Sequence, residues 1–267
     1  MKLCALLVSL SFLSPQSAQD PALERLEKSP RHHEWVDAKR GERTVHCFVA
    51  YPEVKQKVPA VLVIHENKGL NDWVRAIADD LAEAGYVAIA PDLLSGKGPD
   101  GGNSDSFKNS DAARQAIYAL DASAVAADLG IVADHALSLP ACDGTLSVAG
   151  FCWGGSKSFD FATRRKGLKA AFVFYGSAPE DEAALAKIDC PVYGFYGESD
   201  ARITEAVPAT AELMKKAGKK YEPEVYAGAG HGFLRAGEAA DASEPNKKAR
   251  VDAWARWKRL LGGERAK

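Results

Sequence analysis

A cysteine, an aspartate and a histidine each lie in a glycine-containing turn that follows an apolar run of the sequence. Cys152 is at the centre of Gly-Phe-Cys-Trp-Gly-Gly, Asp200 follows Tyr-Gly-Glu-Ser, and His231 lies between two glycines. A free thiol is mostly protonated at neutral pH, so a nucleophilic cysteine needs a base, and that base needs a carboxylate to fix its tautomer. The pattern therefore predicts nucleophilic chemistry, with Cys152 as nucleophile, His231 as base and Asp200 as the orienting acid.

The turn around Cys152 has the form that a nucleophile at the end of a strand requires. The side chain is presented from a strained backbone conformation with neighbouring chain very close, which is why glycines flank it. The segment is a G-x-S-x-G turn with cysteine in place of serine, and the order nucleophile, acid, histidine is that of α/β-hydrolases. The backbone N–H groups of Trp153 and Asn67 are the predicted oxyanion donors.

Glu66 ends another apolar run, in the loop that supplies Asn67. A carboxylate at such a strand end is costly unless it is paired or catalytic, so Glu66 is a candidate site residue. A zinc motif is excluded, because H-E-x-x-H would need a histidine at position 69, which is glycine, and no other His/Cys cluster supplies ligands. We therefore expect neither a metal nor a cofactor.

From residue 44 onward, short apolar runs alternate with longer helical patterns rich in Ala, Leu and Lys. This alternation predicts an α/β fold, with a mostly parallel twisted sheet and helices on both faces. The Gly-rich stretch Ser95–Ser106 is expected to be a loop near the mouth of the site, and Trp254 and Trp257 are expected to pack the last helix onto the sheet. The predicted strands are Thr44–Tyr51, Ala60–His65, Tyr86–Ala90, Thr145–Ala149, Ala170–Tyr175, Pro191–Tyr196 and Glu222–Tyr226, and the predicted helices are Asp72–Ala84, Ser110–Leu137, Gly155–Arg165, Ala206–Ala217 and Asn246–Leu261.

The charge balance and the first residues limit the class of partner and the location. The chain has 267 residues with 34 basic and 36 acidic side chains, so no electrostatic footprint for nucleic acid is visible and a small-molecule substrate is expected. Residues 1–18 resemble a signal peptide, and their apolar run is shorter than the roughly 20 residues that span a bilayer. We expect an exported protein, periplasmic or secreted and without stable membrane insertion, with cleavage near Ala18, an N-terminal segment 19–43, one domain 44–261 and a tail 262–267. The sequence does not predict the oligomeric state.

Four cysteines follow the signal-like segment, at positions 47, 142, 152 and 190. In an exported protein Cys142 and Cys190 could form a disulfide, because each precedes a predicted neighbouring strand. Buried unpaired thiols explain the same residues equally well, and spacing alone does not decide between the two.

Several motifs resemble the dienelactone hydrolase family (carboxymethylenebutenolidases) of the α/β-hydrolase superfamily, over residues 44–261. The spacings of 48 residues from Cys152 to Asp200 and of 31 from Asp200 to His231 are similar to those of the family. The matching motifs are V-I-H-E-x-x-G-L-N around Glu66, A-P-D-L at Ala90–Leu93, the cysteine turn, Tyr175-Gly176, the Asp200 loop and A-G-H-G-F around His231.

The resemblance implies hydrolysis of a small ester or lactone through an acyl-enzyme on Cys152, with Glu66 helping to deprotonate the thiol. It also implies that Arg235 and Tyr175 contact the substrate, since an arginine can bind a carboxylate in bidentate fashion. Two departures affect the substrate: Lys68 stands where the family often has an aromatic residue, and the second family arginine has no clear counterpart, although Arg114 lies in the right region.

Other functions compatible with the sequence are a general carboxylesterase or thioesterase of the same fold and a binding protein that keeps the fold without catalysis. A glutamine amidotransferase is disfavoured, because its histidine is followed two residues later by glutamate, whereas this chain has Phe233 there.

Overall fold

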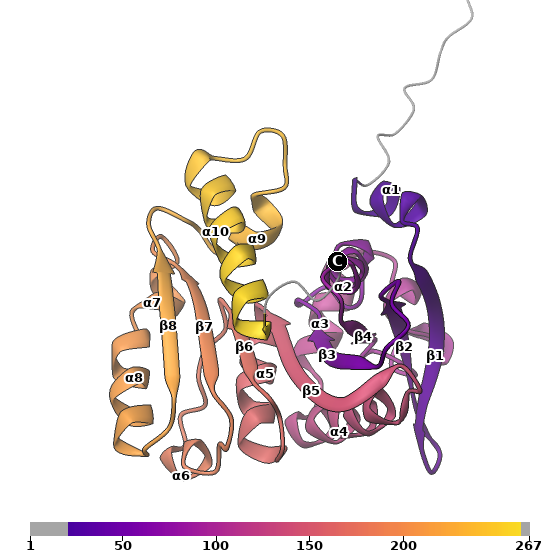
Figure 1. Cartoon of the computed structure of the whole chain (residues 1–267), viewed down its shortest axis with the longest axis horizontal. Helices are drawn as coiled ribbons and strands as arrows, with labels where there is room; N and C mark the ends of the chain where they lie inside the picture. Colours follow the sequence, from indigo (N-terminus) through magenta and orange to yellow (C-terminus); the bar gives the residue numbers. More distant parts are fainter. Residues whose placement is uncertain (1–20, 263–267) are drawn as a thin grey trace, which may run out of the picture.

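Eight strands form one twisted sheet in the computed structural model, which describes residues 21–262 (Figure 1). The strands are β1 (His32–Arg40), β2 (Arg43–Tyr51), β3 (Val58–Ile64), β4 (Val87–Pro91), β5 (Cys142–Phe151), β6 (Ala171–Phe174), β7 (Val192–Gly197) and β8 (Tyr221–Tyr226). Their order is β1-β2-β4-β3-β5-β6-β7-β8, antiparallel from β1 to β4 and parallel across the rest. Every residue of β3 is buried, as expected of a strand that is covered on both faces.

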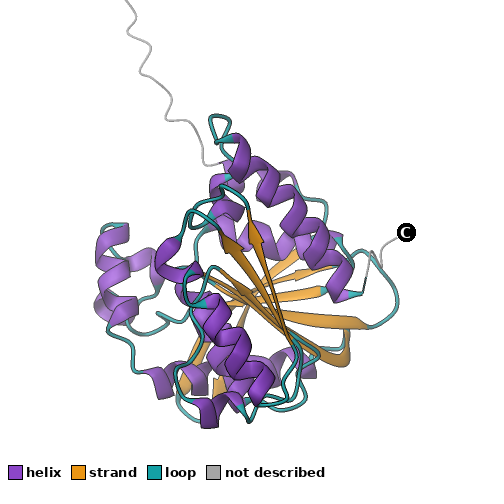
Figure 2. Cartoon of the chain, turned by 90° about the vertical axis from the view of Figure 1, so that its left-hand side faces the viewer, coloured by secondary structure: helices purple, strands orange, loops and turns teal. Residues whose placement is uncertain are grey.

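Helices cover both faces of this sheet (Figure 2). They are α1 (Pro21–Lys28), α2 (Asp72–Glu83), α3 (Ser110–Tyr118), α4 (Ala122–Ser138), α5 (Trp153–Arg164), α6 (Glu182–Leu185), α7 (Ala201–Thr204), α8 (Val207–Lys216), α9 (Phe233–Ala236) and α10 (Glu244–Leu261), with 3-10 turns at Pro99–Gly101 and Ser104–Ser106. One apolar core joins α1, α2, α9 and α10 to the sheet, and a second joins α4, α5, α6 and α8 to the opposite face. The α/β architecture predicted from the sequence is therefore confirmed.

The predicted strands are all found, with bounds that differ from the observed ones by at most three residues, but the single helix predicted over residues 110–137 is wrong. The chain forms two helices there, α3 and α4, with a bend of 101° between them. Asp121 caps the second helix by accepting a hydrogen bond from the backbone N–H of Ala124 at 2.8 Å. A capping aspartate inside an apparently continuous helical pattern is the signal that the prediction overlooked.

Residue 44, where the predicted domain begins, lies in the second strand of a strand pair. Strand β1, which the sequence did not predict, forms an antiparallel hairpin with β2 through the turn at Gly41. Its residues are mostly polar and mostly exposed, as suits an edge strand, so its apolar signal is weak. The sheet therefore begins within the segment that was placed before the domain.

Asp79 on α2 fixes this N-terminal segment to the body of the protein. Its carboxylate accepts hydrogen bonds from Ser29 Oγ at 2.7 Å, from Arg31 Nε at 2.8 Å and from His33 Nε2 at 2.7 Å. These bonds offset the cost of burying the charge, because an ionised carboxylate inside a protein must be fully hydrogen-bonded.

The last helix, α10, packs onto the sheet as predicted from its two tryptophans. Trp257 is fully buried and makes an edge-on contact with Phe174 at 4.8 Å between ring centroids, and Trp254 contacts Trp257 at 5.0 Å. Arg256 lies between them in sequence and donates to two strand carbonyls, Gly194 O at 2.9 Å and Glu222 O at 2.7 Å. These bonds fasten α10 across β7 and β8.

The cysteines and the terminal segments complete the comparison with the sequence. Cys142 and Cys190 are buried free thiols, so the structure contains no disulfide between them. The signal-like residues 1–18 with their cleavage position, and tail residues 263–267, lie outside the described residues. Within residues 21–262, no single helix is long and apolar enough to cross a membrane, and α3 and α4 reach that length and composition only as a bent pair.

Candidate active site

The turn between β5 and α5 holds Cys152 in the conformation expected of a nucleophile. Its φ of 56° is in the left-handed region that few residues other than glycine adopt, and its side chain is half-buried. A Cβ on Gly150 would lie 1.9 Å from the carbonyl oxygen of Gly154, and one on Gly154 would lie 2.3 Å from that of His65. The glycines thus permit the tight turn and its contact with the end of β3.

His231 lies between Cys152 and Asp200, each of which follows a different strand. Its Nδ1 is 2.5 Å from Asp200 Oδ2, and the Asp200 side chain is 7% exposed. Burial lowers the pKa of His231, but hydrogen bonds to Cys152 and Asp200 outweigh it, so the net pKa is raised above 6.5. The structure therefore brings together the three residues that the sequence placed in one site.

His65 orients the loop that carries Glu66 and Asn67. Its ring Nδ1 is 2.7 Å from the carbonyl oxygen of Glu66, and Nε2 accepts from the backbone N–H of Leu93 at 3.3 Å. The pKa of this fully buried ring is lowered by burial, so the neutral tautomer with hydrogen on Nδ1 satisfies both bonds. The ring also stacks on Trp153 at 5.6 Å between centroids, which ties the loop to the cysteine turn.

Arg235 pairs with Glu66 and does not line the pocket that contains Cys152. Its Nε lies 2.8 Å from Glu66 Oε2, and the Glu66 side chain is 4% exposed while that of Arg235 is 43% exposed. Glu66 is thus a paired carboxylate in this structure. Arg114 is also not among the pocket-lining residues and is paired with Asp111 on α3.

Replacing Arg235 with methionine is expected to lower the free energy of unfolding by about 1–2 kcal/mol at pH 7, because it leaves the buried Glu66 carboxylate without its cation. Urea unfolding of the wild type, Arg235→Met, Glu66→Gln and the double variant gives the coupling energy. We expect the double variant to lose less free energy of unfolding than the two single variants lose in sum. Strict additivity would contradict a stabilising pair.

Tyr175 contributes a buried hydroxyl to the same site. Its φ is 41°, its ring contacts His231 edge-on at 5.1 Å, and its buried hydroxyl has no hydrogen-bond partner within residues 21–262. Burial raises the pKa of this phenol well above its usual value, and negative charge on Glu66 and Cys152 raises it further. The phenol is therefore a neutral hydrogen-bond donor among the residues that line the pocket.

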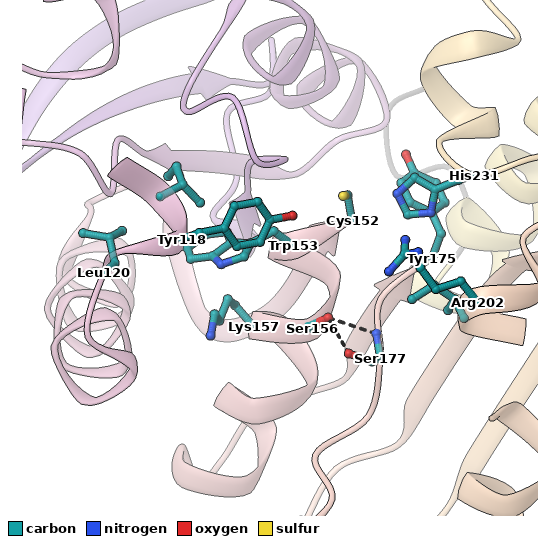
Figure 3. A pocket seen from close by; sticks show the side chains of 12 residues that line it. Tyr118, Leu120, Cys152, Trp153, Ser156, Lys157, Tyr175, Ser177, Arg202 and His231 are labelled. Atoms are coloured by element: carbon teal, nitrogen blue, oxygen red, sulfur yellow. Dashed lines mark hydrogen bonds between the residues drawn. The ribbon is translucent and has the colours of Figure 1, made fainter. Parts of the chain in front are cut away.

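A pocket of about 350 Å³ opens over Cys152 between α3, α5 and α7 (Figure 3). Cys152, Trp153, Tyr175 and His231 all line it, while Asn67 reaches its edge by donating from Nδ2 to the hydroxyl of Tyr118 at 3.1 Å. No residue of the predicted loop Ser95–Ser106 lines the pocket.

Four further polar residues line this pocket that were not predicted from the sequence, namely Ser156, Lys157, Ser177 and Arg202. Two of them could have been predicted from helical periodicity. Ser156 and Lys157 follow Trp153 by three and four residues, so they share its face of α5. Within the described part of the chain, no group of three or more His, Cys, Asp or Glu side chains is arranged to hold a metal ion.

The sequence profile of the dienelactone hydrolase family matches residues 45–264. The chain belongs to this family. A protein of Saccharolobus solfataricus assigned as a carboxymethylenebutenolidase is 30% identical over 247 residues, which cover 81% of this chain and 93% of that protein. A similarly assigned protein of Escherichia coli K12 is 30% identical over 230 residues, covering 78% and 79% of the two chains.

A crystal structure from Klebsiella pneumoniae, assigned as a dienelactone hydrolase, is similar with a TM-score of 0.75 and 25% sequence identity. The similarity covers 86% of this chain and 98% of that one. This dienelactone hydrolase family member is therefore an α/β-hydrolase, and its enzyme class is that of carboxylic ester and lactone hydrolases.

Proposed function

We propose that this enzyme hydrolyses small esters or lactones through a thioester on Cys152. His231 accepts the thiol proton, the sulfur attacks the substrate carbonyl, and the carbon–oxygen bond to the leaving alcohol breaks as His231 returns the proton to it. A water molecule, deprotonated by His231, then hydrolyses the thioester and restores the thiol. The backbone N–H groups of Trp153 and Asn67 stabilise the oxyanion in both steps.

The observation that supports this proposal is the position of His231, which lines the same pocket as Cys152 and is hydrogen-bonded to Asp200. The carboxylate 2.5 Å from Nδ1 fixes the tautomer that leaves Nε2 for the thiol. The raised pKa of His231 agrees with a base that becomes positively charged when it takes the proton of Cys152.

Glu66 is proposed to assist thiol activation after substrate has entered. In this structure its carboxylate is held by Arg235, so it must exchange this partner before its charge can help His231 to deprotonate Cys152. The neutral hydroxyl of Tyr175, which has no bond in the described structure and is affected by both charges, can stabilise the carboxylate or the thiolate during this exchange.

Mass spectrometry of the acyl-enzyme tests the proposal. The protein is mixed with p-nitrophenyl acetate, quenched in acid within milliseconds to seconds, digested and mapped for acetylated peptides. We expect one rapidly formed and rapidly lost acetyl group, on Cys152.

The other cysteines serve as internal controls in this experiment. Cys47 and Cys190 are buried, and burial raises the pKa of both thiols, that of Cys190 to about 11, so they should stay unmodified. Turnover with the transient acetyl group on another residue, or with no acetyl intermediate, would overturn the proposed role of Cys152.

A further inference from the structure

The pocket over Cys152 is lined by two cations and, among the described residues, by no carboxylate. The cations are Lys157 on α5 and Arg202 on α7. The two arginines that the family resemblance suggested for substrate binding are both paired elsewhere, Arg235 with Glu66 and Arg114 with Asp111. Among the residues that line this pocket, Lys157 and Arg202 therefore supply the positive side-chain charge that a substrate can contact.

Lys157 has its ammonium group free for a ligand. The nitrogen lies 5.3 Å from the centroid of the Trp153 ring, a cation–π contact that holds the side chain over the pocket wall. Within residues 21–262 no carboxylate forms an ion pair with it, although the residue is half-buried. A bound anion would supply the counter-charge that the protein itself does not provide.

Arg202 lies two residues after the triad acid. Its Nη2 is 4.0 Å from Asp200 Oδ1, the outer limit of an ion pair, while the other oxygen of Asp200 holds His231. The Arg202 side chain is 70% exposed. Most of its guanidinium donors therefore remain available to a ligand.

Two serines lie between these cations, and one of their two hydroxyl protons is available to a ligand (Figure 3). Ser156 Oγ accepts from the backbone N–H of Ser177 at 2.9 Å, and the two hydroxyl oxygens are 3.0 Å apart. One hydroxyl proton is used between the two oxygens, whichever donates, so the other can point to a ligand. This part of the pocket thus offers two positive charges and one hydrogen-bond donor.

We propose that Lys157 and Arg202 are specificity-determining residues that bind a negatively charged group of the substrate, beside Ser156 and Ser177 and away from the reacting carbonyl. The inference rests on the proposed function for its kinetic consequences. It predicts that the enzyme prefers an ester with a carboxylate to the same ester in neutral form. It places this selection on residues of α5 and α7.

The test uses two substrate pairs that differ by one charge. One pair is 4-acetoxybenzoate and methyl 4-acetoxybenzoate, with the charge on the leaving group, and the other is mono-p-nitrophenyl adipate and p-nitrophenyl hexanoate, with the charge on the acyl group. The readout is the ratio of kcat/KM for the anionic ester to that for its neutral partner, corrected for spontaneous hydrolysis. In at least one pair we expect the ratio to fall about fivefold in Lys157→Met, about fivefold in Arg202→Gln, and further in the double variant, with a smaller preference at high salt.

Matched controls remove one charge outside the pocket. Lys169→Met and Arg259→Gln change exposed cations that line no part of it, so their ratios should equal that of the wild type. An unchanged ratio in the double variant for both pairs, or equal falls in the controls, would overturn the inference while leaving the proposed hydrolysis intact.

A binding measurement separates this inference from the proposed catalysis. Calorimetric titration of 4-acetoxybenzoate into the Cys152→Ala protein measures recognition of the intact ester without turnover. We expect the Kd to rise at least fivefold when Lys157→Met and Arg202→Gln are added to that protein. An unchanged Kd would reject the anion site, whereas a raised Kd combined with a wild type that hydrolyses neither ester would support the anion site and reject the proposed reaction.

Discussion

Alanine in place of Cys152 is expected to lower kcat by a factor of about 10⁴–10⁶ for every ester that the wild type hydrolyses. The reason is that no other nucleophile on the turn lies within reach of His231 in the proposed mechanism. The thiol is half-buried and small, so the midpoint of thermal unfolding should change by no more than a few degrees. Steady-state kinetics and a thermal melt of the two proteins, measured side by side, give both quantities.

Cys152→Ser is the matched comparison for this variant. Serine keeps the shape of the turn but presents a less acidic hydroxyl, so a site whose base is adjusted to a thiol should turn over much more slowly with it. Full activity in Cys152→Ala, in a protein that keeps its melting temperature, would remove the nucleophile assignment.

Asparagine in place of Asp200 is expected to lower kcat by a factor of about 10⁴, because the amide no longer fixes the tautomer of His231 or stabilises its charged form. The same change should move the acid limb of the kcat/KM profile to lower pH. The sign follows from the contacts of His231. Its pKa is raised in part by the hydrogen bond and the negative charge of Asp200. Removing that charge lowers the pKa of His231, so the base becomes neutral at a lower pH.

A pH profile measured from 4.5 to 9 distinguishes this electrostatic effect from a loss of structure. Unfolding would reduce the rate at every pH without shifting the limb. Asp189→Asn removes an exposed carboxylate, the partner of Lys166 at 3.9 Å, and should change neither the rate nor the limb. An acid limb that stays in place in Asp200→Asn would show that Asp200 does not act on the catalytic base.

The sequence predicts the elements that depend on local signals. The nearly continuous apolar runs of the central strands and the glycines around Cys152 are typical of a covered sheet and a tight turn, and both are found. Strand β1 was missed because an edge strand pairs through its backbone and needs few apolar side chains. The break between α3 and α4 depends on Asp121. Its capping role was missed because the helical pattern continues on both sides of this single residue.

The contacts within the site could be predicted only in part. The order of the three turns indicated that Cys152, Asp200 and His231 would meet, because carboxyl ends of neighbouring parallel strands lie along one edge of a sheet. The pairing of Glu66 with Arg235, which are 169 positions apart, depends on where α9 lies after the last strand, and no periodicity encodes that. Lys157 and Arg202 likewise line the same pocket only because α5 and α7 pack beside the same strand ends.

Arg256 is also expected to affect the order in which the site forms during synthesis. Strands β7 and β8, which precede Asp200 and His231, are tied together at Gly194 and Glu222 by a guanidinium near the end of the chain, with its carbon 4.4 Å from the centroid of Phe195. The turn that presents Cys152 leaves the ribosome about a hundred residues earlier, at the ordinary pace of N-terminal to C-terminal emergence. We therefore expect the nascent chain to carry its thiol long before the base and acid are held in place, and to become active once α10 has packed over these two strands.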